Sequence, residues 1–429
     1  MAESHAASDQ QRIQQRIVGV LAAAQILGGI GVASGIAVGA LLAADLGTES
    51  LSGLASASSV IGAALIAVPV SRVMNVHGRR PGLLLAYGIG IAGALLTIAA
   101  ATAGWLAVAL VGLVLTGGGT AAGLQSRYAA TDLAEPARRG RSLATVVWAT
   151  TVGSVLGPNL AEPMGDFATS IGVPRLAGPY MLTVVAFMTA ALIIALFLRP
   201  DPLLLARREA ARREGNEGPG ASLRKSVRAT LAEIASSPSA SLGLLAMALG
   251  HAVMVGVMSM TPVHLQHGGA SLQIIGLVIS GHITGMYVAS PVVGMLSDRF
   301  GRRPMIVAGT MILLAAVGIA GTADRHDSTR LAVGLFLLGL GWSCTLIAGS
   351  TLLTESVPIG ERPTVQGTAD LVMGIAGASA GVLSGIVVGL GSYGLLTAIA
   401  ALLVVPLLVF AVRGGTGPGG AVGIPNAPV

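Results

Sequence analysis

The sequence predicts an all-α membrane protein in which twelve transmembrane helices form two six-helix bundles. Three observations predict this fold: 53% of residues are hydrophobic and only 10% are charged, twelve apolar runs are long enough to cross a bilayer, and one short motif recurs at a fixed offset. A soluble domain carries about 25% charged residues. Most of this chain should therefore lie in lipid.

The twelve spans follow from length, because a helix needs about 20 apolar residues to cross a membrane. The polar stretch 199–238 separates the first six from the last six. We therefore expect a cytoplasmic N-terminal tail (1–16), an N-terminal bundle (17–198), a cytoplasmic linker (199–240), a C-terminal bundle (241–412) and a disordered C-terminal tail (413–429). The predicted spans are Ile17–Ala44, Leu51–Val70, Gly82–Ala101, Trp105–Ala130, Ser142–Ala161, Gly178–Leu198, Ser241–Val263, Leu272–Val293, Met305–Thr322, Leu331–Thr354, Val365–Val388 and Leu395–Val412.

Positive charge alternates between the two sides of these spans. Of the 25 Lys and Arg residues, 22 fall on the side of both termini and the linker, and only Arg175, Arg325 and Arg330 fall on the other. Loops rich in Lys and Arg stay in the cytoplasm, so both termini should be cytoplasmic. The basic residues mark topology and do not form a nucleic-acid patch. The single cysteine, Cys344, excludes an internal disulfide and a cysteine-cluster metal site.

The two halves carry an internal repeat. Gly78-Arg79-Arg80-Pro81 returns as Gly301-Arg302-Arg303-Pro304, an offset of 223, and the same offset carries Asp132 to Glu355. Six spans per half make both halves start on the same side. The predicted repeat is therefore parallel.

The segment from Gly294 to Arg303 resembles the signature loop of the major facilitator superfamily. The resemblance implies a monomeric transporter rather than an enzyme, a symporter or antiporter in the lipid bilayer with no tightly bound cofactor. We expect this segment to latch the cytoplasmic face through Gly294, Asp298, Arg299, Gly301, Arg302 and Arg303. In the first half Asn75 and Val76 replace Asp298 and Arg299, which predicts a weaker latch there.

Histidine and methionine residues gather in the seventh and eighth spans. At about 100° per residue, His251, Met254 and Met258 share one helix face, and His282 and Met286 share another. Imidazole and thioether together suit Cu(I). The methionines and the histidines each have an ordinary interpretation too, since Met fills gaps in cores and a membrane histidine can form a hydrogen bond between helices. Yet four of the seven histidines and five of the fourteen methionines fall between positions 247 and 286. We therefore predict that the two adjacent spans share a copper site.

This pattern resembles the CcoA-like bacterial copper importers of the superfamily, through Met254-Val-Gly-Val-Met258 and His282-Ile-Thr-Gly-Met286. The resemblance implies copper import across the bacterial cytoplasmic (inner) membrane by alternating access, for assembly of haem–copper oxidases. It implies Cu(I) or a copper chelate as cargo and a cytoplasmic copper acceptor as partner. Met254 and His282 would be the residues most tied to uptake.

Three further residues are candidates for function. His264 and His267 would capture copper at the outer mouth, or else are solvated histidines. Asp370, near the inner end of the eleventh span, would carry a coupling proton, or else would pair with a nearby arginine.

Three rival functions remain open. The Gly153–Pro158 segment resembles the glycine–proline motif of proton-coupled drug exporters, which favours an antiporter for small organic molecules. A membrane haem protein ligated by His251 and His282 is a second rival. A copper receptor that does not transport is the third.

Overall fold

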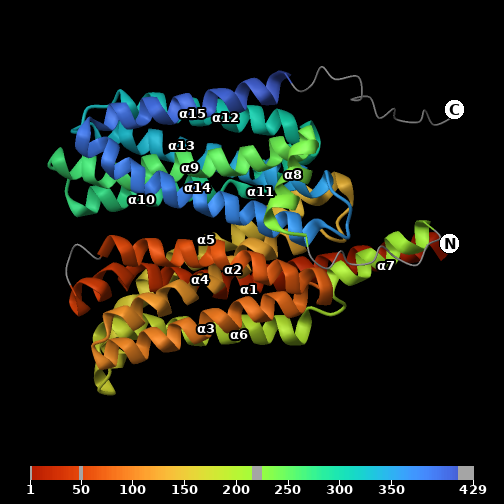
Figure 1. Ribbon diagram of the computed structural model, residues 1–429, viewed down its shortest axis with the longest axis horizontal. Helices are drawn as coiled ribbons and strands as arrows, with labels where there is room; N and C mark the ends of the chain where they lie inside the picture. The colour runs from red at the N-terminus through yellow and green to blue at the C-terminus, as the bar shows by residue number, and fades with distance from the viewer. Residues whose placement is uncertain (1, 48–51, 215–224, 414–429) are drawn as a thin grey trace.

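The protein is helical throughout the part that the computed structural model describes, residues 2–47, 52–214 and 225–413 (Figure 1). The first half contains α1 (Ala2–Leu46), α2 (Ser52–His77), α3 (Arg79–Ala103), α4 (Leu106–Ala129), α5 (Arg139–Ser170) and α6 (Gly178–Phe197). Two short helices follow, α7 (Pro202–Glu214) and α8 (Val227–Ser236). The second half contains α9 (Pro238–His267), α10 (Leu272–Tyr287), α11 (Ser290–Phe300), α12 (Arg302–Gly321), α13 (Ser328–Glu355), α14 (Arg362–Leu390) and α15 (Tyr393–Arg413).

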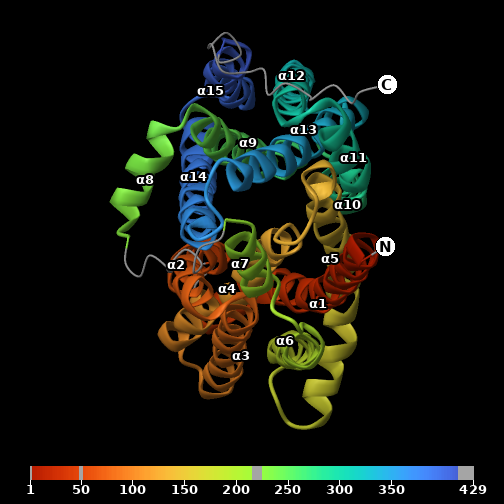
Figure 2. The same cartoon turned by 90° about the vertical axis from the view of Figure 1, so that its right-hand side faces the viewer.

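Twelve of these helical segments are long and apolar enough to cross a membrane, as predicted. The start of α1, the end of α15 and the helices α7 and α8 lie at one end of the molecule, which we call the basic end (Figure 1). We call the opposite end the far end. Figure 2 looks along the helices from the basic end and separates the two halves.

Several helix bounds differ from the predicted spans. The first helix begins at Ala2, so the polar residues expected in a tail extend α1. The seventh span begins at Pro238 rather than Ser241, because the Ser237 side chain accepts a hydrogen bond from the Ala240 N–H and caps α9. The disordered tail predicted for 413–429 lies, after Arg413, outside the described residues.

The eighth span is broken into α10 and α11. It runs from Gln273 to Phe300 and not from Leu272 to Val293. Pro291 has no N–H to donate, and its ring crowds the carbonyl of Tyr287, where α10 ends. The residues from Gly294 to Phe300, expected in a loop, therefore form the last turns of α11, and only Gly301 turns the chain.

Glycine allows the helices within each half to approach closely. A Cβ on Gly153 of α5 would lie 2.6 Å from the backbone of Gly29 on α1. Small residues at such crossings let two membrane helices pack backbone to backbone. The glycine–proline segment of α5 thus packs against α1.

The halves meet at two seams, α2 against α14 and α5 against α11. A Cβ on Gly367 of α14 would lie 2.2 Å from the Ser71 hydroxyl on α2. A Cβ on Gly294 of α11 would lie 2.5 Å from the Ala144 side chain on α5. These contacts involve the turns of each helix that are nearest the basic end, so the halves close on each other there.

Candidate functional site

A cavity of about 390 Å³ lies between the two halves. Its walls come from α1, α2, α4 and α5 of the first half and from α9, α10, α13 and α14 of the second. Both walls are largely apolar, and polar side chains interrupt them, among them Gln25, Arg127, Thr150, His251 and Asp370. Pockets of this size and composition fit small organic ligands.

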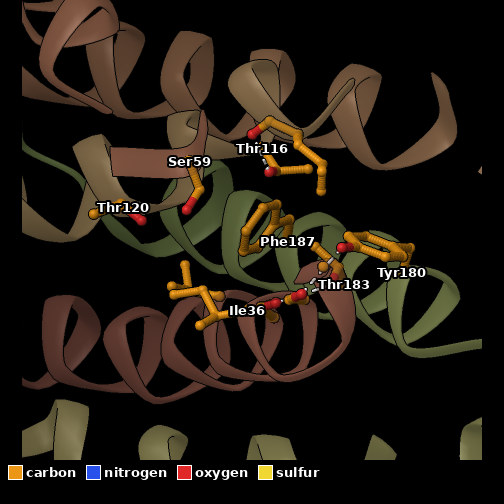
Figure 3. Close-up of a pocket in the computed structure, with 12 residues that line it drawn as sticks. Ile36, Ser59, Thr116, Thr120, Tyr180, Thr183 and Phe187 are labelled. Atoms are coloured by element: carbon orange, nitrogen blue, oxygen red, sulfur yellow. Dashed lines mark hydrogen bonds between the residues drawn. The ribbon is translucent and has the colours of Figure 1, made fainter. Parts of the chain in front are cut away.

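A smaller side pocket of about 30 Å³ opens within the first half (Figure 3). Gly31 and Gly35 of α1 make room there for Tyr180 and Thr183 of α6. The Thr183 hydroxyl donates to the Gly31 carbonyl at 2.8 Å, and the Tyr180 hydroxyl donates to the Gly35 carbonyl at 3.0 Å. These polar groups already have backbone partners, so the pocket is a packing space rather than a binding site.

Arg127 on α4 and Asp370 on α14 form a buried ion pair in the wall of the central cavity. Nη2 of Arg127 lies 2.6 Å from Oδ1 of Asp370, and the two side chains are 2% and 0% exposed. Gln125 donates its amide N–H to Oδ2 of Asp370 at 2.8 Å, and the Tyr128 hydroxyl donates to Oδ1 at 3.4 Å. Both carboxylate oxygens are therefore bonded by groups from the other half.

The guanidinium of Arg127 is only partly satisfied. Its Nε and Nη1 have no hydrogen-bond partner among the described residues, although both atoms are buried. Its carbon lies 4.8 Å from the centre of the Tyr128 ring. Buried donors without an acceptor are costly, so this arginine is suited to a ligand that brings one.

A second buried pair continues the polar network away from the cavity. Nε of Arg79 lies 2.7 Å from Oδ2 of Asp132, and neither side chain is exposed. Arg79 also donates to the side-chain oxygen Oε1 of Gln125 at 3.4 Å and to Oε1 of Gln366 at 2.7 Å. Gln125 therefore joins the Arg79 pair to the Asp370 pair.

Aromatic rings form one side of the cavity. The Trp342 indole N–H donates to Nδ1 of His251 at 3.1 Å, which leaves Nε2 to carry the proton of a neutral imidazole. Tyr287 meets Trp342 edge to face, with ring centres 5.8 Å apart. This wall can pack against a flat organic ring.

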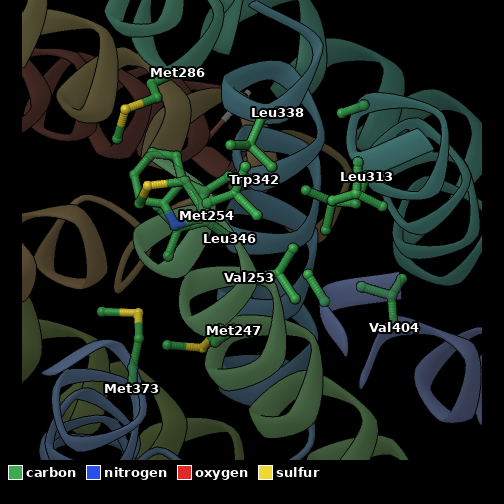
Figure 4. Close-up of a cluster of buried hydrophobic side chains, with 14 of the residues drawn as sticks. Met247, Val253, Met254, Met286, Leu313, Leu338, Trp342, Leu346, Met373 and Val404 are labelled. Carbon is green, nitrogen blue, oxygen red and sulfur yellow. The ribbon is translucent and has the colours of Figure 1, made fainter. Parts of the chain in front are cut away.

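The predicted copper residues divide between different environments. His251 and Met286 line the cavity. Met254 is buried with Met286 in a hydrophobic cluster around Trp342, and Met258 packs against that cluster. Figure 4 shows Met247, Met254 and Met286 on different turns and helices of this cluster. His282 is buried, and its Nδ1 lies 2.8 Å from the Leu335 carbonyl on α13.

The helix α13 explains this division. It packs along both α9 and α10, which themselves touch little. A helix from later in the chain therefore lies along both spans, and a copper site shared by their sulfur and imidazole groups stays a prediction. No cluster of three His, Cys, Asp or Glu side chains suited to a metal occurs in the described residues.

The predicted mouth residues, His264 and His267, lie at the far end, in the last turns of α9. His264 stacks on Tyr393, with ring centres 4.4 Å apart, and the Tyr393 hydroxyl shares a hydrogen bond with Thr261 at 2.8 Å. His267 is exposed. The stack holds the His264 ring against Tyr393.

The predicted latch residues surround the seam between α5 and α11. Asp298 accepts hydrogen bonds from the backbone N–H groups of Gly140 and Arg141, both at 2.8 Å, and so caps the start of α5 in the other half. Arg302 pairs with Asp298 and, at 3.0 Å, with Glu355.

The remaining latch residues shape and anchor this corner. Gly301 has a φ of +97°, which an L side chain adopts only with strain. Arg303 donates to the Ala411 carbonyl at 2.6 Å, and Arg299 lies over the Phe300 ring at 5.4 Å. Gly294 permits the close approach of α11 to α5 described above.

The repeat offset of 223 relates ion pairs as well as sequence. Arg79 pairs with Asp132 in the first half, and the equivalent Arg302 pairs with Glu355 in the second. The latch itself is not repeated. Where the second half has Asp298, the first has Asn75, and Arg207 of α7 donates to both its backbone and side-chain oxygens at 2.6 Å.

Comparison with known proteins identifies the family. A model described as Major Facilitator Superfamily matches residues 20–272 and 265–423. The chain belongs to the major facilitator superfamily. It is therefore a multi-pass membrane transporter and not an enzyme.

Individual members of the superfamily match nearly the whole chain. The chain is 42% identical over 407 residues to "Uncharacterized MFS-type transporter YdeG" of Bacillus subtilis, covering 94% of this chain and 93% of that protein. It is 27% identical over 361 residues to "Riboflavin transporter RfnT" of Brucella anthropi, covering 84% and 85%. Its fold resembles that of the transporter FucP in the outward conformation, with a TM-score of 0.69 at 17% identity, covering 92% and 97%.

Sequence reasoning found Asp370 but missed Arg127, Gln125 and Arg79 as parts of the site. Arg127 and Arg79 were counted only as topology signals, and Gln125 lies in an apolar span. A signal was available, because a polar residue at membrane depth usually has a partner or a function.

Proposed function

We propose that this chain is a proton-coupled transporter of small organic molecules that works by alternating access, with Asp370 as the group that carries the proton. The observation that carries the proposal is the buried Arg127–Asp370 pair in the wall of a cavity shared by both halves. A carboxylate held only by groups of the opposite half loses those partners when the halves separate. Its affinity for a proton then changes with the conformation, which is what coupling requires.

The cavity supports an organic cargo. Its volume of about 390 Å³ far exceeds what a bare ion needs, and its walls are mainly apolar with an aromatic side at Trp342 and Tyr287. RfnT, the relative at 27% identity, is named for riboflavin, an organic molecule with a fused ring.

We place the basic end in the cytoplasm, following the 22 of 25 basic residues on that side. Contact between the halves at the basic end then corresponds to an outward-facing state. Asp298, which caps α5 from the other half, serves as the latch of that state together with Arg302 and Glu355.

The proposal is tested with purified protein in liposomes that contain a pH-sensitive dye. Riboflavin and a panel of small organic molecules are added outside, and proton flux is recorded for the wild type, for Asp370→Asn, and for Asp166→Asn as an exposed control carboxylate. We expect at least one compound to drive proton flux in the wild type and in the control but not in Asp370→Asn. The direction of flux gives symport or antiport. Proton flux in Asp370→Asn equal to that of the wild type would contradict the role of Asp370 as the proton carrier.

Copper import is the second candidate, because His251 and Met286 line the same cavity and Met373 adds another soft sulfur. The test is copper accumulation by cells that carry His251→Asn, Met286→Leu and Met373→Leu together. Leucine keeps the volume of methionine while removing its sulfur. Accumulation equal to that of the wild type would eliminate this candidate.

A further inference from the structure

We infer that the cargo is a small organic anion whose carboxylate, or an equivalent anionic group, docks on Arg127 and frees Asp370 to take up a proton. This inference rests on the proposed function and names the class of substrate for the same cavity.

The unused hydrogen-bonding capacity of the ion pair favours an anion. Both oxygens of Asp370 already accept hydrogen bonds, from Arg127, Gln125 and Tyr128. Arg127 retains two buried nitrogen atoms, Nε and Nη1, that have no partner in the part of the chain that the structure describes. An anion can accept a charge-assisted hydrogen bond from either of these N–H groups, whereas a cation would have to displace partners from Asp370.

The rest of the cavity suits the organic part of such an anion. Trp342 and Tyr287 offer ring surfaces, and His251 keeps a proton on Nε2 because its Nδ1 accepts from Trp342. Gln25 lies on the opposite wall, and its carbonyl oxygen is buried without a partner among the described residues. The site therefore pairs one anion-binding group with an aromatic surface and one free acceptor.

Binding of an anion and binding of a proton are coupled by exchange at Arg127. When the cargo carboxylate binds the free side of the guanidinium, one positive charge faces two anions, and the buried Asp370 no longer has a counter-charge of its own. A buried carboxylate without a counter-charge binds a proton more readily. A hydronium ion of the solution on the open side gives up its proton, leaving water, and the proton forms the O–H bond of Asp370, so that an anion and a proton move together without net charge.

Other titratable groups lie around Asp370. Tyr128 shares the α4 side with Arg127, and His251 faces the cavity from α9. Arg79 acts from α3 through Gln125, and Asp132 already neutralises it. Arg127 is thus the cation whose engagement decides the charge of Asp370.

The test uses three probes that share one ring system: 2-naphthoate, 2-naphthamide and 2-naphthylmethylamine. Their binding to the purified wild-type protein in detergent is measured at pH 7 by isothermal titration calorimetry. We expect the anion to bind about tenfold or more tightly than the neutral and cationic probes. In buffers of different ionisation enthalpy, its binding should take up about one proton.

Two variants and a control locate the effect. Arg127→Gln should abolish the preference for the anion. The double variant Arg127→Gln/Asp370→Asn, which leaves no unpaired charge, should also lack it and take up no proton. Arg138→Gln, which removes an exposed guanidinium, should bind the anion as the wild type does. The wild-type ranking requires no variant, so a folding defect in Arg127→Gln cannot hide the answer.

Failure of this inference can be separated from failure of the proposed function. A transporter of neutral or cationic cargo would drive proton flux in liposomes yet rank the amide or the amine first, which overturns the inference alone. Absence of binding by all three probes at millimolar concentration overturns it as well. Tight binding of the anion without any proton flux would support the anion site and contradict the proposed transport function.

Discussion

Nη2 of Arg127 and Oδ1 of Asp370 lie 2.6 Å apart across the boundary between the two halves of the chain. The contact is buried, and the desolvation of two charges opposes its formation. It persists because Gln125 and Tyr128 add hydrogen bonds to the carboxylate. Any movement that separates α4 from α14 must break this contact or exchange it for another.

The first prediction concerns the stability of this pair. Arg127→Met leaves a buried carboxylate without its counter-charge and should lower the free energy of unfolding by about 3–5 kcal/mol. Arg127→Met combined with Asp370→Leu removes both charges and should cost clearly less. Unfolding in sodium dodecyl sulfate, followed by tryptophan fluorescence, measures both values. Equal losses would mean that the pair is not coupled.

The second prediction concerns the latch. Asp298→Asn keeps the shape of the side chain but removes the charge that caps α5 through Gly140 and Arg141. A hydrogen bond to a charged group contributes about 1.5–3 kcal/mol. We therefore expect the population with a closed basic end to fall about tenfold or more relative to the open one.

Distances between spin labels at Arg138 and Phe300, both exposed at the basic end, report this equilibrium in a Cys344→Ala background. The matched control is Asp166→Asn, at an exposed site outside this seam. A distance distribution for Asp298→Asn that overlays the unsubstituted one would contradict the latch.

The third prediction concerns the glycine at the same seam. A Cβ on Gly294 would lie 2.5 Å from the Ala144 side chain and 2.6 Å from the Gly140 carbonyl oxygen. Gly294→Ala should therefore destabilise the closed basic end by about 1–3 kcal/mol. Gly318→Ala is the control, because nothing lies within 4 Å of its added Cβ. The same spin-label distances distinguish Gly294→Ala from Gly318→Ala. A basic end that stays closed in Gly294→Ala would contradict the prediction, because it would show that the seam accommodates the added methyl group.

The fourth prediction concerns pH. Lys225 lies 2.8 Å from Glu233, and it also contacts Glu361. Hydrogen bonds to Glu233 and Glu361 raise the pKa of Lys225. A hydrogen bond shared with Glu233, aided by Lys225, lowers the pKa of Glu361, and the same shared bond raises the pKa of Glu233.

The signs of these shifts set the pH range in which the cluster stabilises the fold. The raised pKa of Lys225 gives stability below its usual pKa, and that stability is lost as pH rises through the raised value. The lowered pKa of Glu361 gives stability above its usual pKa, lost as pH falls, while the raised pKa of Glu233 opposes it. Lys225→Gln should therefore lower the melting temperature slightly between about pH 5 and pH 10 and hardly at all outside that range. The loss should be at most about 1 kcal/mol, because all three groups are partly exposed. An equal loss of melting temperature at all pH values would contradict a stabilising role for the ion pairs of Lys225.

The fold could be predicted from sequence because its determinants are local or periodic. Span length, the alternation of Lys and Arg, and the offset of 223 between Arg79 and Arg302 are each visible without a structure. The break between α10 and α11 was missed, although Pro291 marks it in the sequence. The residues on both sides of that proline are apolar, so a count of apolar residues does not detect the break in the helix.

The site could be predicted only in part, because it depends on which helices become neighbours. The polarity of Asp370 was visible, and its partner Arg127 was not, since 243 residues and the boundary between the halves separate them. The stripe of His251 and Met254 on one helix face predicts a site shared with His282, and this stays a prediction. Periodicity gives the face of a helix but not the identity of the helix that covers it, and here that helix is α13.

Arg207 of α7 donates to Asn75 in the first half and, at 2.9 Å, to the Gly360 carbonyl in the second. Lys225, on the other side of the linker, bonds to Glu361. After cleavage of the peptide between Glu214 and Lys225, Arg207 on the first fragment would still bond to Gly360 on the second, while Lys225 and Glu361 would stay together on the second. Two separately synthesised fragments should therefore reassemble through Arg207 and the seams between the halves.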